Sequence, residues 1–367
     1  MPVDGVGVAR LSPGTLGGGS GRNAEPAHGG GVSGGHHERI NERAGPLPTL
    51  SRIGHSKLTA TIELTKPNIT KLVTLTSAVG YVLGIYGQTF AWWQLAISAL
   101  GCIIGTALSA AGANALNMWW ERHRDCLMAR TAKRPLPTGR MFPATAFLIG
   151  TGLSVAGVLT LALACNLAAA SVSLATILIY VLVYTPMKVR SPLATLVGAV
   201  PGALPPLIGW CAALTVGTPI GSTVASGLWT GLTTLGGWSL FTLMFVWQIP
   251  HFLAIAWMYK DEYARGGHAV LPVFDPTGVK TTAVIVIGAV VLLPATLLPA
   301  LIMPDRLGIA FAAIAGLTGI AYIVWCCRLL GNKSAATARA VFFGSIIHLP
   351  ILLIAMVGEV AVRVIMR

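Results

Sequence analysis

Nine long apolar runs constrain this chain more than any other feature of its sequence. Their approximate positions are 68–87, 94–118, 142–162, 167–185, 193–215, 232–258, 281–302, 307–327 and 341–361. A helix needs roughly 20 apolar residues to cross a bilayer, and each run is close to that length. Strands of a membrane barrel would alternate in hydropathy, whereas these runs are continuous. We therefore predict an all-α integral membrane protein with nine transmembrane helices.

The net charge of +13 would indicate a nucleic-acid partner in many soluble proteins, but here its distribution follows the membrane. Fourteen Lys and Arg residues lie on alternate connections between the runs, and the intervening connections hold one, Arg306. The positive-inside rule then places the basic connections and the N-terminus in the cytoplasm. Arg363 and Arg367 run against this trend. We expect a lipid bilayer around the chain and no nucleic-acid partner.

Residues 1–55 form a leader rich in Gly, Pro, Ser and His, without an apolar core, and we predict that it is disordered. Residues 56–367 are the membrane domain. The leader has no apolar stretch typical of a signal peptide, and a mitochondrial transit peptide would be richer in Arg and poorer in acids. We therefore predict a bacterial inner membrane protein, with the mitochondrial inner membrane as the alternative.

One acidic cluster follows the apolar run at 94–118. If that helix continues for two turns, four polar residues recur at intervals of three or four and share one face: Asn114, Asn117, Glu121 and Asp125. Two carboxylates one turn apart repel each other unless a cation or an arginine lies against them. The alternative is a solvated loop face neutralised by Arg122 and Arg124.

A second acidic cluster, with Asp275 downstream, follows the run at 232–258. Both clusters come after an aromatic helix end and precede a Leu-Pro pair, which indicates two halves that face one cavity. Mg²⁺ usually shares one or two carboxylates with substrate phosphates, so the clusters predict a diphosphate site. The expected metal ligands are Glu121, Asp125, Asp261 and Glu262. The bases expected to hold the remaining phosphate oxygens are Arg130, Arg134, Lys188 and Arg190.

At these residues the sequence resembles the UbiA superfamily of intramembrane prenyltransferases. The stretch NMWWERHRDCLMARTAKRPLPTGR (117–140) is similar to that family's NxxxDxxxD motif and to the RTxxRPLPxG signature that follows it. Three other stretches resemble its haem-farnesylating branch: YTPMKVRSPLATLVGAVPGALPPLIGW (184–210), WQIPHFLAIAWMYKDEYARGG (247–267) and ARAVFFGSIIHLP (338–350). In one departure, Glu121 stands where the superfamily usually has aspartate.

The resemblance implies nine helices around a central cavity open to the cytoplasmic side. It implies that farnesyl diphosphate binds through Mg²⁺ near haem B, and that a farnesyl group is added to a haem vinyl group to give haem O. Haem B is then a substrate, and a haem A synthase is an expected partner. The implied catalytic residues are Asn117, Glu121, Asp125 and Asp261. Further contacts to the diphosphate are expected from Asn114 and Tyr184.

Aromatic side chains near the inner helix ends could stabilise an allylic cation through their π-faces. The candidates are Trp119, Trp120 and Tyr184. The alternative is an interfacial aromatic belt without a role in the reaction.

Two histidines lie inside apolar runs, where an ionisable residue indicates function. His251 follows Pro250 and is predicted to contact haem, through the iron or a propionate; the alternative is a structural hydrogen bond at a proline kink. His348, two residues before Pro350, is the second candidate for haem. For His123 and His268, which lie in the acidic loops, we expect a surface position or a phosphate contact.

Two other functions fit part of the pattern. A prenyltransferase with a different acceptor, such as a quinone precursor or a chlorin, would share the acidic clusters but not the WQIPHF stretch around His251. A haem carrier or assembly factor without enzymatic activity would also use a helical bundle with a polar cavity, and fold alone does not exclude it.

Overall fold

The computed structural model describes residues 50–214 and 231–366, with side chains from residue 57 onward. These residues form helices and no strands. Nine of the helical segments in the described part are long and apolar enough to cross a membrane, which confirms the predicted fold class. The chain is a multi-pass membrane protein.

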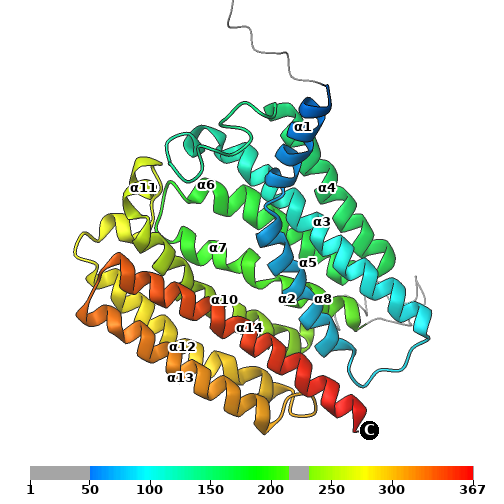
Figure 1. Ribbon diagram of the computed structural model, residues 1–367. Coiled ribbons are helices and arrows are strands. Elements are labelled where there is room, and N and C mark those ends of the chain that lie inside the picture. Colours follow the sequence, from blue (N-terminus) through cyan, green and yellow to red (C-terminus); the bar gives the residue numbers. More distant parts are fainter. Residues whose placement is uncertain (1–49, 215–230, 367) are drawn as a thin grey trace, which may run out of the picture. The chain divides into compact units, whose positions relative to one another are not determined.

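Figure 1 labels the helices that form the spans and colours them in chain order, from blue to red. They are α2 (Pro67–Ile85), α3 (Trp92–Asp125), α4 (Pro143–Ala164), the continuous run of α5 (Leu167–Leu178), η1 (Ile179–Tyr184) and α6 (Thr185–Met187), the pair α7 (Ala194–Ala203) and α8 (Pro205–Ala213), α10 (Leu235–Met258), α12 (Val279–Ile302), α13 (Ile309–Gly331) and α14 (Ala335–Ile365). The η1 segment is a single stretch of π-helix within its span.

Two features differ in detail from the sequence prediction, and a third confirms a condition that the prediction set. The helix α1 (Leu50–Leu64) begins inside the segment predicted to be a disordered leader, and residues 1–49 lie outside the described residues. The run predicted at 193–215 is interrupted at Leu204, because Pro205 and Pro206 lack the amide protons that a continuous helix needs there. Helix α3 continues past its apolar part as far as Asp125, which confirms the condition for a shared polar face.

Small residues allow several helix pairs to pack closely. A Cβ on Gly112 of α3 would lie 2.7 Å from the Gly150 carbonyl of α4, and a Cβ on Gly157 of α4 would lie 2.7 Å from the Gly105 carbonyl of α3. This is the close backbone approach that glycine permits between membrane helices. Helix α2 packs against α8, and α10 packs against α12 and α14. The largest apolar core joins α10 with α12, α13 and α14 (Figure 1).

The α2–α8 contact generates a stability prediction. A Cβ on Gly80 would collide with the Pro206 backbone, whereas a Cβ on Gly152 of α4 meets no atom within 4 Å. We expect Gly80→Ala to lower the unfolding temperature in detergent, because overpacking costs about 1–3 kcal/mol. The matched variant Gly152→Ala is expected to leave it unchanged or to raise it, since alanine favours helix by about 1 kcal/mol over glycine. Equal unfolding temperatures for the two variants would contradict the packing described.

Candidate active site at the end of α3

The polar face predicted at the end of α3 is present and is buried. Asn114, Asn117, Glu121 and Asp125 each expose 6% of their surface or less. Burial of two carboxylates one turn apart requires compensating charge, because an unpaired buried ion costs several kcal/mol.

Two cations from other segments compensate these carboxylates. The Lys188 ammonium lies 2.9 Å from Glu121 Oε1, and Nη1 of Arg134 donates to both oxygens of Asp125 at 2.8 Å. Burial acts to lower the pKa of Lys188, but Glu121 raises it above its usual value. Arg122 instead donates to the Trp119 carbonyl. The alternative of a solvated face neutralised by Arg122 and Arg124 is therefore wrong.

A third cation, Lys66, was not singled out from the sequence. It lies between α1 and α2 with a φ of 47°, in the left-handed region where a lysine is strained. Its ammonium donates to Asn117 Oδ1 at 2.7 Å, and Asn117 Nδ2 donates to Thr185 Oγ1 at 3.1 Å. Burial, followed by the charge of Arg134, lowers the pKa of Lys66 to about 7. The only sequence signal was a lysine placed directly before Pro67, the first residue of α2.

The loop after α3 contacts the short helix α11 (Lys260–Arg265), so the two acidic clusters lie next to each other. The Arg130 amide donates to Glu262 Oε2 at 3.3 Å, and the Arg130 guanidinium donates to the Tyr263 hydroxyl at 3.2 Å. The Ala269 amide, beyond α11, donates to the Lys188 carbonyl at 2.7 Å. Three connections thus converge at the end of α3.

The acids of the second cluster occupy different positions. Asp261 is exposed, and its side chain makes no hydrogen bond or ion pair with the described residues. Asp275 instead accepts hydrogen bonds from the Thr281 amide and the Thr277 hydroxyl, which places it at the start of α12. Of this cluster, Glu262 makes the direct contact with the loop after α3.

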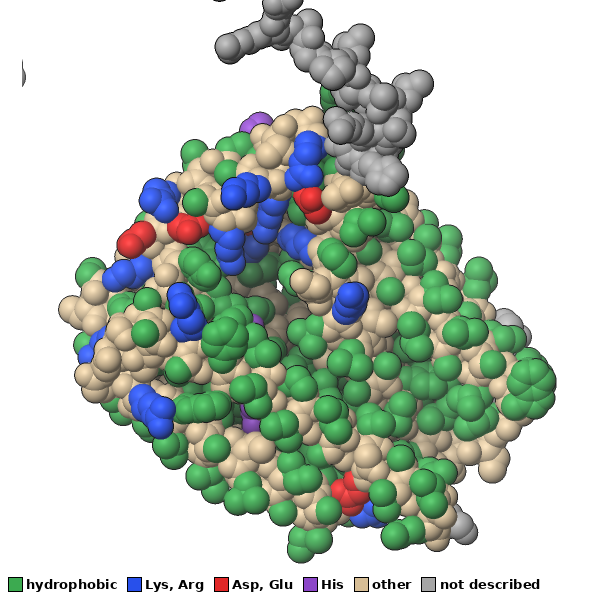
Figure 2. Space-filling model, viewed as in Figure 1, with side chains coloured by type: hydrophobic (Ala, Val, Ile, Leu, Met, Phe, Trp, Pro, Cys, Tyr) green, Lys and Arg blue, Asp and Glu red, His purple; other side chains and the backbone are tan. Residues whose placement is uncertain are grey.

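A pocket of about 310 Å³ opens beside these cations. Its lining residues are Glu63, Lys66, Pro67, Met118, Arg130, Lys133, Arg134 and Pro135. Figure 2 shows Lys and Arg side chains gathered around the mouth of a hollow on this face, with histidine inside it. Positive charge around a pocket that contains a single acid favours an anionic ligand.

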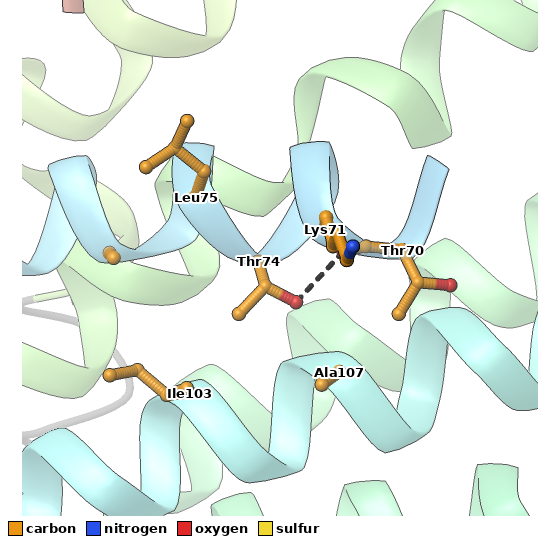
Figure 3. A pocket seen from close by; sticks show the side chains of 7 residues that line it. Thr70, Lys71, Thr74, Leu75, Ile103 and Ala107 are labelled. Atoms are coloured by element: carbon orange, nitrogen blue, oxygen red, sulfur yellow. Dashed lines mark hydrogen bonds between the residues drawn. The ribbon is translucent and has the colours of Figure 1, made fainter. Parts of the chain in front are cut away.

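A second pocket, of about 410 Å³, lies between α2 and α3 and is mainly apolar (Figure 3). Its lining residues are Thr70, Lys71, Thr74, Leu75, Ala78, Ile103 and Ala107. Asn114, predicted to contact diphosphate, donates instead to Thr70 Oγ1 at 3.4 Å and to the Thr65 carbonyl at 3.5 Å. It ties α3 to the start of α2 in this structure.

The carboxylates have the right chemistry for a magnesium ion but are not gathered around a vacant position. Within residues 57–214 and 231–366, no group of three or more His, Cys, Asp or Glu side chains is placed to hold a metal. Glu121 and Asp125 supply the hard oxygen donors that Mg²⁺ prefers, and each is paired with a cation that also suits phosphate. The donor set therefore fits a metal that arrives together with an anionic substrate.

The aromatic candidates divide into two groups. The Tyr184 ring lies beside the site, with the Lys188 ammonium 4.5 Å from its centre and Tyr180 at 5.6 Å. Trp119 packs on Phe147 of α4 at 4.9 Å, and Trp120 is exposed. This geometry favours the interfacial belt for the two tryptophans. Arg190 is also exposed, and its side chain makes no hydrogen bond within the described ranges.

The histidines predicted to contact haem lie on neighbouring helices, α10 and α14. His251 is half-buried, and its Nδ1 lies 2.7 Å from Ser345 Oγ. His348 is enclosed, stacked on Tyr322 at 5.7 Å, and neither ring nitrogen has a hydrogen-bond partner in the described part of the chain. His268, expected at the surface or on phosphate, is buried rather than at the surface, and burial lowers its pKa to about 4.

Comparison with known proteins decides the family. The UbiA prenyltransferase family matches residues 73–347, well over half of the chain. This chain belongs to the UbiA prenyltransferase family. It is 41% identical over 299 residues to the protoheme IX farnesyltransferase of Solibacter usitatus, covering 79% of this chain and 95% of that protein. It is 40% identical to the one from Myxococcus xanthus over 319 residues, covering 84% and 95%.

Solved structures show the same UbiA fold. Digeranylgeranylglyceryl phosphate synthase has a TM-score of 0.64 at 18% identity, covering 83% of this chain and 99% of that one. A UbiA homolog from Archaeoglobus fulgidus bound to GPP and Mg²⁺ has a TM-score of 0.56 at 16% identity, covering 82% and 99%. At these identities the likeness concerns the fold alone.

The depressed pKa of Lys66 predicts a pH dependence for binding of a prenyl diphosphate. A bound anion raises that pKa, so binding takes up a proton above pH 7. The last ionisation of a phosphate group has a pKa of about 6, so the ligand is mostly ionised above pH 7 and contributes little to this dependence. We therefore expect the affinity of the wild type for a prenyl diphosphate to fall by up to about tenfold per pH unit above pH 7, and the affinity of Lys66→Met to stay constant over the same range.

The measurement is a titration by calorimetry between neutral and alkaline pH, with Lys71→Met as the control. Lys71 is an exposed lysine of α2, and its side chain makes no hydrogen bond or ion pair with the described residues. Its removal is expected to preserve the wild-type slope. A Lys66→Met protein that kept the slope would show that another group takes up the proton.

Proposed function

We propose that this protein transfers the farnesyl group of farnesyl diphosphate to a vinyl group of haem B, forming haem O on the route to haem A. The observation that carries the proposal is the match, along most of the chain, to relatives named protoheme IX farnesyltransferase. The buried acidic and basic assembly at the end of α3 supports the diphosphate half of the reaction, and the histidines of α10 and α14 support the haem half.

The bond changes assign a task to the charged groups. The allylic C–O bond of farnesyl diphosphate breaks, a vinyl carbon of haem B bonds to the farnesyl carbon, and water adds at the neighbouring carbon with loss of a proton. Diphosphate leaves with concentrated negative charge. Cations fixed near the leaving oxygens lower the barrier to this ionisation.

Four cations surround the site proposed for the diphosphate: Lys66, Arg130, Arg134 and Lys188. Lys188 and Arg134 are held on carboxylates in the structure. In the proposed complex they bind phosphate oxygens, while Glu121 and Asp125, joined by Asp261 and Glu262 of α11, hold Mg²⁺. When bound, the metal neutralises charge on the departing diphosphate. Asn117 positions Lys66 through its hydrogen bond.

The organic part of the substrate requires a dry wall. The Lys188 ammonium lies over the face of the Tyr184 ring, and in the proposed complex, with Lys188 on phosphate, this face would stabilise an allylic cation. On the haem side, His251 and His348 are the proposed contacts. We place the protein in a bacterial inner membrane with the basic loops and the N-terminus in the cytoplasm, and a haem A synthase as the consumer of its product.

The proposal is tested by incubating the purified protein with haem B, farnesyl diphosphate and Mg²⁺ and analysing the porphyrins by mass spectrometry. A farnesylated, hydrated haem is expected, and its formation is expected to stop when EDTA removes the metal. Prenylation of a hydroxybenzoate or a chlorophyllide, with haem unchanged, would replace this acceptor with another.

The variant Asp125→Asn distinguishes an enzyme from a haem carrier. Loss of this charge is expected to lower the rate of haem O formation by roughly a hundredfold or more, because Asp125 would hold the metal that stabilises the departing diphosphate. Asp305→Asn is the matched control, since Asp305 pairs with Arg306 at the opposite end of the spans. A carrier would show little effect of either change on haem binding, and no product with any variant.

A further inference from the structure

The side chain of Ser345 on α14 is held between two partners on different helices. Its Oγ lies 2.6 Å from the Phe342 carbonyl of α14, where it donates, and 2.7 Å from His251 Nδ1 of α10. A serine hydroxyl has one proton and can donate it to one partner only.

Counting protons assigns the histidine tautomer. If the serine donated to His251, two oxygens would face each other at 2.6 Å with no proton between them, which is unfavourable. If the serine donates to the Phe342 carbonyl, its lone pair accepts Nδ1–H of His251, and both contacts are satisfied. Nδ1 of His251 therefore carries a proton. Because His251 lies within a membrane span, where a charged imidazolium is costly, the ring is neutral and Nε2 carries a free lone pair.

The position of the ring is fixed as well. His251 stacks on Trp247, one turn earlier on α10, at 4.7 Å and 22°, and the Phe342 ring lies 5.1 Å away. The Trp247 indole also donates to the Ser345 carbonyl at 3.0 Å. The plane of the imidazole is thus set by Trp247 of α10 and Phe342 of α14, and its proton by Ser345 of α14, while Nε2 makes no hydrogen bond with the described residues.

We infer that His251 binds the haem iron through Nε2, and that Ser345 is the positioning residue that makes this nitrogen available. The inference rests on the proposed function, because it takes haem B as the substrate. A bare Nε2 lone pair forms the iron–nitrogen bond directly, with no proton to release. It cannot donate a hydrogen bond to a propionate, which decides between the two contacts expected from the sequence.

His348 is the less suitable ligand on the same helices. It is 3% exposed and stacked on Tyr322, which is 1% exposed. Both of its nitrogens lack a partner among the described residues, so no neighbour fixes its tautomer. An iron ligand of this kind usually has its second nitrogen held by a hydrogen bond, and only His251 meets that condition.

The test compares haem B with metal-free protoporphyrin IX, both added without farnesyl diphosphate or Mg²⁺ to the full chain in detergent. Wild-type protein is expected to bind haem B more tightly than the metal-free porphyrin. His251→Ala is expected to abolish this difference, and Ser345→Ala to weaken haem B binding by about tenfold or more while sparing the metal-free porphyrin. Equal losses for both porphyrins would indicate a propionate contact and overturn the inference.

Resonance Raman spectroscopy of the reduced haem complex gives a readout that a purely structural role would not move. The iron–histidine stretch is expected in the wild type, absent in His251→Ala, retained in His348→Phe, and shifted to lower frequency in Ser345→Ala, with recovery in Ser345→Thr. The matched control is Ser239→Ala on α10, because Ser239 Oγ donates to the carbonyl three residues earlier in the same way, at 2.7 Å. A stretch that persists in His251→Ala, or is unchanged in Ser345→Ala, would overturn the inference.

These measurements separate the ligation from the reaction. A protein that makes haem O but lacks the iron–histidine band would retain the proposed function and lose this inference. A protein that shows the band but forms no farnesylated haem would retain the ligation and lose the proposed function.

Discussion

Two carboxylates buried at the end of α3 remain compatible with the fold because Lys188 and Arg134 lie directly against them. An isolated buried ion costs several kcal/mol, so the pairing requires the loops that carry these cations to fold over the helix end. The positions of the loop after α3 and of the loop after α6 follow from this requirement. The same pairs hold, near one another, the acids that suit a metal and the bases that suit a phosphate.

The charged assembly uses segments that are far apart in the sequence. Lys66 reaches Asn117 from the start of α2, and Arg130 links the loop after α3 to α11 through Glu262 and Tyr263. Because each segment contributes one or two groups, no single stretch of sequence contains the site. This pairing also explains why the described residues carry no preformed metal cluster, because Glu121 and Asp125 are each held by a cation.

The acids at the end of α3 were predictable from the sequence, whereas their cationic partners were not. Helix periodicity placed Glu121 and Asp125 on one face, and the structure confirms that face. The sequence did not decide which cations neutralise it, and left Arg122 and Arg124 open as an alternative, because spacing shows which residues are near along a helix but not which loop folds back. Lys66 was overlooked because its contact with Asn117 joins residues that are distant in the sequence, and because its left-handed backbone cannot be recognised from the sequence.

The sequence by itself determined the nine spans and the family, because a bilayer demands apolar runs of a fixed length and the motif residues lie within continuous stretches. Only the tertiary structure decided the pairing of charges and the proton position on His251. Both depend on contacts between helices that are distant in sequence, such as that of Ser345 with His251. The donor and the acceptor in the hydrogen bond between His251 and Ser345 can be assigned only when all partners of the serine hydroxyl are known, and the packing of α10 on α14 supplies them.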